Sequence, residues 1–255
     1  MRNDNDETTR VIQTYWERRA TSFDDEVGHG LVSDGQRRAW LALLSQLAGP
    51  APRRVLDVGC GTGFLALRFA ELGHTVTGID LASQMIDRAR SKAEQADLDV
   101  DFRVGNAEAL DFPDKHFDWV VGRHLIWNLP DPERGVTEWL RVLRPGGRLA
   151  LIEGKWAYNE ALARRYARPA WRFLAWIIEV AADLASRGRG TYRRYRRIEV
   201  QLPFSGGPTA KRLVEFLRAY DLEDLAVEPL MDSTLWGETP EFSRYLVVGT
   251  RALVS

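Results

Sequence analysis

The chain has 255 residues, and its 35 basic and 36 acidic side chains leave a formal net charge of -1. This near-neutral balance argues against a dedicated nucleic-acid binder, and the length fits one large domain or a core domain with an insertion. Apolar residues make up 45% of the chain, which is enough for a sizeable core. The single cysteine excludes a disulfide within the chain and favours a reducing, cytoplasmic location.

The first fifty residues are expected to be helical. Residues 8–23 place apolar side chains at helical spacing after Thr8, a candidate N-cap, and residues 34–49 run from an acid to a glycine before Pro50. The N-terminal "MRNDNDETTR" has no apolar signal-peptide core. The longest near-apolar stretch, residues 170–182, is too short to cross a bilayer, so we expect no membrane span.

Strands and helices then alternate. Strands are predicted at 54–58, 75–79, 100–104, 117–122 and 147–153, and helices at 63–72, 83–95 and 132–143. A helix at 208–219 and strands near 224–230 and 243–251 follow. Helical crossovers between short apolar strands predict a parallel sheet covered on both faces. The fold class is therefore α/β, with a doubly wound, mostly parallel, seven-stranded sheet.

A glycine-rich stretch, "VLDVGCGTGFLAL" (55–67), joins the first strand to its helix. Gly59, Gly61 and Gly63 are more glycines than a tight turn needs, and they allow a ligand to lie against the main chain. "GTGFLA" fits the G-x-G-x-x-A dinucleotide fingerprint, but it starts two residues late and leaves Asp57 unexplained. The alternative pattern, acid-x-Gly-x-Gly-x-Gly, uses Asp57 together with all three glycines.

Four motifs in order carry a family resemblance: "VLDVGCGTG", "GHTVTGIDLASQMIDRAR" (73–90), "VGNAEALDFPDKHFDWVV" (104–121) and "LRVLRPGGRLALIE" (140–153). With these, the chain resembles the class I S-adenosylmethionine-dependent methyltransferases, in the small-molecule branch near the quinone-biosynthesis enzymes. The resemblance covers residues 10–154 well and 205–251 loosely. It implies a Rossmann-like methyltransferase fold, S-adenosylmethionine as cofactor, and direct in-line methyl transfer to a small metabolite or natural product.

The resemblance also implies a set of cofactor-binding residues. Asp80, which ends the second strand, would accept both ribose hydroxyls and can also cap the next helix. Arg123 or Arg19 would meet the methionine carboxylate, with a surface ion pair or helix packing as the alternative. The expected set is Asp57, Gly59, Cys60, Gly61, Gly63, Asp80, Leu81, Met85, Asn106, Ala107, Arg123 and Arg19.

Methyl transfer from a sulfonium needs alignment of the reactants, exclusion of water and, for some acceptors, removal of a proton. His124 and Glu153 follow the fourth and fifth strands, where each is either a general base or a structural residue. Tyr15 and His29 belong to the N-terminal segment, the usual lid of this branch. The candidate catalytic residues are His124, Glu153, His29 and Tyr15. Scattered histidines suggest no metal site.

Residues 155–200 have an excess of seven positive charges and several aromatic residues, and we interpret them as a helical insertion that caps the acceptor site. One methyltransferase domain would then comprise a lid (1–50), a cofactor-binding core (51–154), a cap (155–205) and a C-terminal completion of the sheet (206–255). The predicted acceptor-binding residues are Trp16, Trp127, Trp156 and Trp176. They favour an aromatic or otherwise flat acceptor, without deciding between nitrogen, oxygen and carbon as the methylated atom.

The segment "TYRRYRRIEV" (191–200) leaves alternatives open. Interleaved arginines and tyrosines suit a nucleic-acid or protein methyltransferase, whereas a solvated or subunit-facing helix would fit a homodimer. The Asn-Pro-Pro-aromatic motif of amino-methylating nucleic-acid enzymes is absent, because "RHLIWNLPDP" stands at that position. A cofactor-holding protein without turnover, or a peripheral membrane protein using residues 170–182, is the remaining alternative.

Overall fold

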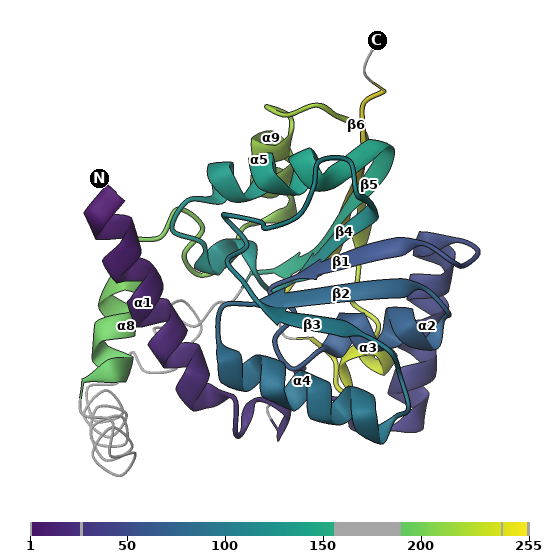
Figure 1. Ribbon diagram of the computed structural model, residues 1–255, viewed down its shortest axis with the longest axis horizontal. Helices are drawn as coiled ribbons and strands as arrows, with labels where there is room; N and C mark the ends of the chain where they lie inside the picture. The colour runs from purple at the N-terminus through teal and green to yellow at the C-terminus, as the bar shows by residue number, and fades with distance from the viewer. Residues whose placement is uncertain (1, 26–27, 156–189, 241, 254–255) are drawn as a thin grey trace.

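The computed structural model describes residues 2–25, 28–155, 190–240 and 242–253. A seven-stranded sheet forms its centre, with the strand order β3-β2-β1-β4-β5-β7-β6 (Figure 1). The strands are β1 (Arg54–Val58), β2 (Thr75–Asp80), β3 (Asp101–Val104), β4 (Phe117–Arg123), β5 (Leu143–Gly154), β6 (Leu222–Pro229) and β7 (Arg244–Arg251). Only β7 runs antiparallel to its neighbours, β5 and β6. The predicted fold class is confirmed.

Helices cover both faces of the sheet. Figure 1 shows α3 and α4 below it, α2 at its right and α5 and α9 above it, while α1 and α8 lie side by side near the carboxyl ends of β1 and β2. The helices are α1 (Arg2–Arg19), η1 (Phe23–Asp25), α2 (Asp34–Ala48), α3 (Phe64–Glu71), α4 (Ser83–Gln95), η2 (Ile126–Asn128), α5 (Pro132–Val142), α8 (Thr191–Glu199), α9 (Ala210–Leu217) and α10 (Ser233–Trp236).

Neighbouring residues of each central strand enter two different cores. In β1, Val55 packs with Trp40 of α2 in one cluster, whereas Leu56 packs with Trp139 of α5 in the other. Successive side chains of a strand point to opposite faces, so a strand that is buried on both sides must be apolar throughout. This explains why the central strands appear in the sequence as continuous apolar runs.

The structure moves several predicted boundaries. Helix α1 starts at Arg2, so the prediction of Thr8 as its N-cap is wrong. Strand β5 starts at Leu143, four residues before the predicted 147, because Leu143 already pairs with Phe117 ahead of a register shift. Residues 156–189, most of the helical insertion predicted at 155–200, lie outside the described residues.

Two polar contacts attach the N-terminal segment to the sheet domain. Helix α4 begins after Ala82, which has no side-chain oxygen to cap it. Instead Glu17 of α1 accepts hydrogen bonds from the backbone N–H groups of Ser83 and Gln84, at 2.8 and 2.9 Å. A carboxylate there satisfies exposed amides and complements the helix dipole. Helix α1 is thereby fixed beside the carboxyl end of β2.

The second contact joins η1 to the glycine-rich loop. Asp24 accepts a hydrogen bond from the Thr62 hydroxyl and pairs with Lys92 of α4, whose ammonium lies 3.0 Å from an Asp24 oxygen. The Lys92 ammonium also donates to the Thr62 hydroxyl, at 3.0 Å. The lid segment, the loop and α4 therefore meet in one polar cluster.

Replacing Glu17 with Gln tests the first contact. Glu17→Gln keeps the side-chain shape but removes the charge and one acceptor oxygen, so the α4 N-terminus loses about 1 kcal/mol of capping. We expect faster hydrogen–deuterium exchange at the amides of Ser83 and Gln84. The exposed neighbour Arg18, changed to Gln, is the matched control. Equal protection in both variants would contradict the capping role.

Candidate functional site

A cavity of about 330 Å³ lies at the carboxyl ends of β1, β2 and β4. We call its two parts the glycine-loop half and the aromatic half. The glycine-loop half is lined by residues 59–62, Asp57, Asp80 and residues 105–107. The aromatic half is lined by rings from α1, from α8 and from the segment after β4. One continuous space thus joins the sheet's switch point, between β1 and β4, to the helical lid.

The three glycines of the loop serve different purposes. All have positive φ, at +63° for Gly59, +54° for Gly61 and +84° for Gly63. A Cβ at Gly59 would lie 2.6 Å from Leu125, and one at Gly63 would lie 2.9 Å from Phe102, so protein packing explains both residues. A Cβ at Gly61 would meet nothing closer than a Phe23 ring carbon at 3.6 Å. Gly61 is therefore the glycine that leaves room in the cavity.

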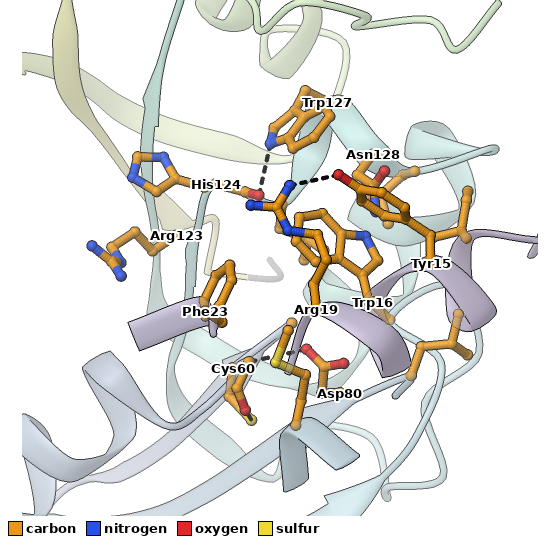
Figure 2. A pocket seen from close by; sticks show the side chains of 18 of the residues that line it. Tyr15, Trp16, Arg19, Phe23, Cys60, Asp80, Arg123, His124, Trp127 and Asn128 are labelled. Carbon is orange, nitrogen blue, oxygen red and sulfur yellow. Dashed lines mark hydrogen bonds between the residues drawn. The ribbon is translucent and has the colours of Figure 1, made fainter. Parts of the chain in front are cut away.

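Asp80 connects the loop to helix α4. One carboxylate oxygen accepts from the Gly61 N–H and the other from the Ala82 N–H, both at 2.9 Å. Each oxygen keeps a second lone pair, and the side chain lines the cavity (Figure 2). Burial raises the pKa of Asp80 to about 6. The N-cap of α4 is Ala82, and Asp80 accepts only the N–H of that cap residue, so the expectation that Asp80 itself caps the helix is wrong. Its role in ligand binding stays a prediction.

Asp57 and Cys60 also line the glycine-loop half. Asp57 accepts a hydrogen bond from the Ala66 N–H at 2.9 Å, which fixes the first turn of α3. Burial raises the pKa of Asp57 to about 7, and the charge of Arg123 opposes that rise. Burial likewise raises the pKa of the Cys60 thiol, so this sulfur is a packing atom at neutral pH.

The expected adenine-binding residues, Leu81, Met85, Asn106 and Ala107, all line the cavity. The Asn106 side-chain oxygen already accepts the Glu108 N–H at 2.9 Å, and the Ala107 carbonyl accepts the indole N–H of Trp139 at 2.9 Å. Sequence reasoning missed Glu108, a cavity-lining acid whose pKa burial raises to about 7. Its position two residues after Asn106, within the third motif, was the available signal.

Arg123 binds main-chain oxygens of the lid. Its guanidinium lies 3.7 Å from the centre of the Phe64 ring and donates to the carbonyls of Gly28 and His29, at 2.8 and 3.1 Å. No carboxylate among the described residues lies within ion-pair distance of it. Burial lowers the pKa of Arg123 to about 9. Among the described residues, Arg123 therefore does not form the surface ion pair that was the alternative to ligand binding.

His29 and His124 line the cavity with their ring centres 6.1 Å apart. Burial, followed by the charge of Arg123, lowers the pKa of His29 to about 3 and that of His124 well below its usual value. Both rings are therefore neutral at pH 7 in the unliganded protein, and neither holds a proton easily. His124 has a φ of +59°, a left-handed conformation at the end of β4.

Glu153 is buried and does not belong to the cavity lining. One of its carboxylate oxygens accepts the N–H groups of Leu125 and Ile126, at 2.8 and 2.9 Å. Burial raises the pKa of Glu153 to about 8. In this geometry Glu153 positions the chain after β4, which carries His124 and Trp127.

The aromatic half is a cluster of rings. Tyr15 stacks on Tyr195 of α8 with ring centres 3.7 Å apart, and Trp16 contacts Tyr15, Tyr195 and Trp127 edge-on. Arg19 lies over Tyr15 and Trp16, with its guanidinium carbon 5.5 and 5.6 Å from their ring centres (Figure 2). The rings of Tyr15, Trp16 and Trp127 were predicted at this site, whereas Trp156 and Trp176 lie outside the described residues.

Helix α8 supplies lining residues that sequence reasoning missed. Tyr192, Tyr195, Arg196 and Glu199 share one helix face and line the cavity. The Tyr195 hydroxyl donates to the side-chain oxygen of Asn128 at 2.8 Å, which joins α8 to the segment after β4. The spacing of 192, 195, 196 and 199 was the signal, because these positions recur once per helical turn.

The described residues hold no group of three or more histidine, cysteine, aspartate and glutamate side chains placed to bind a metal ion. No helix in this part of the chain is both long and apolar enough to cross a membrane.

Residues 56–151 match the family model of the methyltransferase domain. The chain is 42% identical over 125 residues to phosphatidylethanolamine N-methyltransferase of Cereibacter sphaeroides, covering 48% of this chain and 59% of that protein. It is 40% identical over 126 residues to demethylmenaquinone methyltransferase of Deinococcus radiodurans, covering 48% and 52%. These matches therefore span little more than half the length of either relative.

Solved structures agree on the fold. A methyltransferase from Methanosarcina mazei superposes with a TM-score of 0.55 at 25% identity, covering 83% of this chain and 98% of that one. The cyclase SpnF superposes with a TM-score of 0.64 at 19% identity, covering 95% and 96%, a likeness of fold alone. Over residues 56–151 the chain matches the methyltransferase domain and is similar to class I S-adenosylmethionine-dependent methyltransferases, quinone-biosynthesis enzymes among them.

Proposed function

We propose that this chain transfers a methyl group from S-adenosylmethionine to a small, flat acceptor by direct in-line displacement. The observation that carries the proposal is the single cavity that joins the Asp80 carboxylate and the open face of Gly61 to the ring-lined aromatic half. Such a space would place a cofactor in one half next to an acceptor in the other, and alignment of the two reactants is the main requirement of the reaction.

The glycine-loop half suits the cofactor. The lone pairs left on Asp80 can accept two ribose hydroxyls, Leu81 and Met85 offer apolar surface to a base, and Gly61 keeps the main chain uncovered. The bound cofactor supplies a methyl group activated by the positive charge of its sulfonium. The chain's own task is to orient that group and keep water away from it.

The aromatic half suits the acceptor. Rings from α1, α8 and the segment after β4 enclose it, and flat molecules pack well against such surfaces. We extend the proposal to residues 155–205 as the acceptor cap, since α8 within this range lines the cavity. The outer face of α8 exposes Arg193, Arg194 and Arg197.

The inward tyrosines of α8 favour a small acceptor over a nucleic acid. A nucleic-acid surface needs rings and arginines on the same exposed face, but here Tyr195 is buried against Tyr15, whereas the exposed arginines are Arg193, Arg194 and Arg197 on the other side of α8. The exposed arginine Arg194 instead pairs with Glu7 of α1 at 2.5 Å. A cytoplasmic, small-molecule methyltransferase is therefore the function that we propose.

Asp80→Ala tests the cofactor assignment. Loss of two hydrogen bonds to a carboxylate should weaken S-adenosylhomocysteine binding by about 1.5–3 kcal/mol, roughly ten- to hundredfold, in calorimetry. The wild-type protein should bind no NAD. Binding of NAD without binding of S-adenosylhomocysteine would overturn the assignment.

The same carboxylate predicts a pH dependence. Because the pKa of Asp80 is raised to about 6, the ionised acceptor is present above that pH and is lost as the pH falls through it. The affinity for S-adenosylhomocysteine should thus decrease below pH 6. The variant Asp80→Asn has no carboxyl group that can titrate at this position. Its affinity for S-adenosylhomocysteine should therefore not show the decrease centred near pH 6. An identical pH profile in both proteins would exclude Asp80 as its source.

Gly61→Val tests the approach of the ligand to the loop. The added branches would occupy cavity space, so S-adenosylhomocysteine affinity should fall at least about tenfold, since such steric blocks exceed 1.4 kcal/mol. Gly49→Val is the matched control, because Gly49 also has positive φ, at +68°, and its Cβ would meet nothing within 4 Å. Equal binding by the two variants would show that the loop does not approach the ligand.

A further inference from the structure

We infer that Asn128 determines which molecules the aromatic half accepts, because its side-chain amide donates hydrogen bonds to an uncharged carbonyl oxygen or ring nitrogen of the methyl acceptor. Asn128 is then a specificity-determining residue. The inference rests on the proposed function and adds a chemical requirement to its flat acceptor. It depends on the orientation of the amide, on the two donors that this orientation leaves, and on the character of the cavity around them.

Asn128 lies on a fixed piece of main chain. It ends η2, the short helix after β4, and it lines the cavity although only 8% of the residue is exposed (Figure 2). Its backbone N–H donates to the Leu125 carbonyl at 2.9 Å. The buried Glu153 in turn accepts the N–H groups of Leu125 and Ile126. The Asn128 side chain is therefore held in place without help from a ligand.

A hydrogen bond from α8 orients the amide. The Tyr195 hydroxyl donates to the Asn128 side-chain oxygen at 2.8 Å, and among the described residues this hydroxyl has no other acceptor. The Tyr195 ring is buried and stacks on Tyr15, so the hydroxyl keeps its position. Because a buried tyrosine proton needs an acceptor, the amide oxygen faces Tyr195 and the amide nitrogen, Nδ2, faces away from it.

The Nδ2 group of Asn128 carries two N–H donors, and neither finds an acceptor in the described part of the chain. The nitrogen is not fully enclosed by protein, so it keeps surface toward the cavity that the residue lines. The two indoles of the aromatic half cannot replace it. The Trp127 N–H donates to the His124 carbonyl at 2.8 Å, and the Trp16 nitrogen is enclosed by protein. Two buried donors of this kind suit a ligand atom with a lone pair.

The cavity around the amide favours an uncharged partner. Burial raises the pKa of Asp80 to about 6 and that of Glu108 to about 7, and it lowers the pKa of Arg123 to about 9. All three side chains line the cavity, so its interior disfavours charge of either sign. A neutral amide can bind a carbonyl oxygen or a ring nitrogen there without the desolvation of an ion.

The test compares 1-indanone with indane, two fused-ring molecules that differ by one carbonyl group. In an NMR titration of the wild-type protein saturated with S-adenosylhomocysteine, 1-indanone should move the Asn128 side-chain amide protons downfield, as a hydrogen bond to a carbonyl does. Indane should not. The Asn106 side chain of the glycine-loop half is the internal control, and 1-indanone should leave its amide protons unmoved.

The same contact should appear in the affinities. The preference for 1-indanone over indane, as the ratio of their Kd values, should decrease about fivefold in Asn128→Leu, the effect of one neutral hydrogen bond. That variant leaves the Tyr195 hydroxyl without its acceptor. The double variant Asn128→Leu/Tyr195→Phe removes both partners together and should show the same decrease. Persistence of the wild-type preference in the double variant would overturn the inference.

Calorimetry with S-adenosylhomocysteine separates the two proposals. If the wild-type protein does not bind it, the proposed function itself fails. If it binds while 1-indanone shows no saturable binding or leaves the Asn128 amide protons unmoved, only the role of Asn128 is wrong. A loss of S-adenosylhomocysteine affinity in Asn128→Leu with an unchanged preference for 1-indanone would place Asn128 at the cofactor and would also overturn the inference.

Discussion

The site depends on one half-buried carboxylate. Asp80 holds the Gly61 N–H and the Ala82 N–H at the same time, so the glycine-rich loop and the start of α4 are fixed relative to each other. The acid is kept in an environment that resists its charge, as its raised pKa shows. Two amides in a fixed geometry partly offset that burial. A ligand with paired hydroxyls would complete the shell of hydrogen bonds.

The contacts that hold the N-terminal lid lie close to the segments that Asp80 connects. Glu17 caps α4 at Ser83 and Gln84, directly after Asp80's partner Ala82. Asp24 binds Thr62 in the glycine-rich loop, and Arg123 donates to the carbonyls of residues 28 and 29. Aromatic packing of α1 against α8 then closes the other side. Short-range polar contacts thus position the lid, while burial of apolar surface between the helices stabilises its packing.

Much of this organisation could be predicted from the sequence. The strand–helix alternation, Asp80, Gly61, and the rings of Tyr15, Trp16 and Trp127 all lie where their motifs indicated. The packing roles of Gly59 and Gly63 could not be foreseen, because they depend on Leu125 and Phe102, which are distant in sequence. The same holds for Glu153, which binds main-chain amides of the segment after β4. For α8 the helical spacing marks one face, but the packing of that face against α1 is seen only in the structure.

The left-handed backbone at His124 limits what substitutions of this residue can show about its chemical role. At a φ of +59°, glycine, asparagine, aspartate and histidine are tolerated best, and a β-branched residue is strained. A substitution at 124 therefore changes the main-chain conformation as well as removing the imidazole. Loss of activity in an alanine variant would mix conformational strain with any lost proton transfer. Asparagine is the more informative replacement, because it removes the imidazole while tolerating the same turn of the chain.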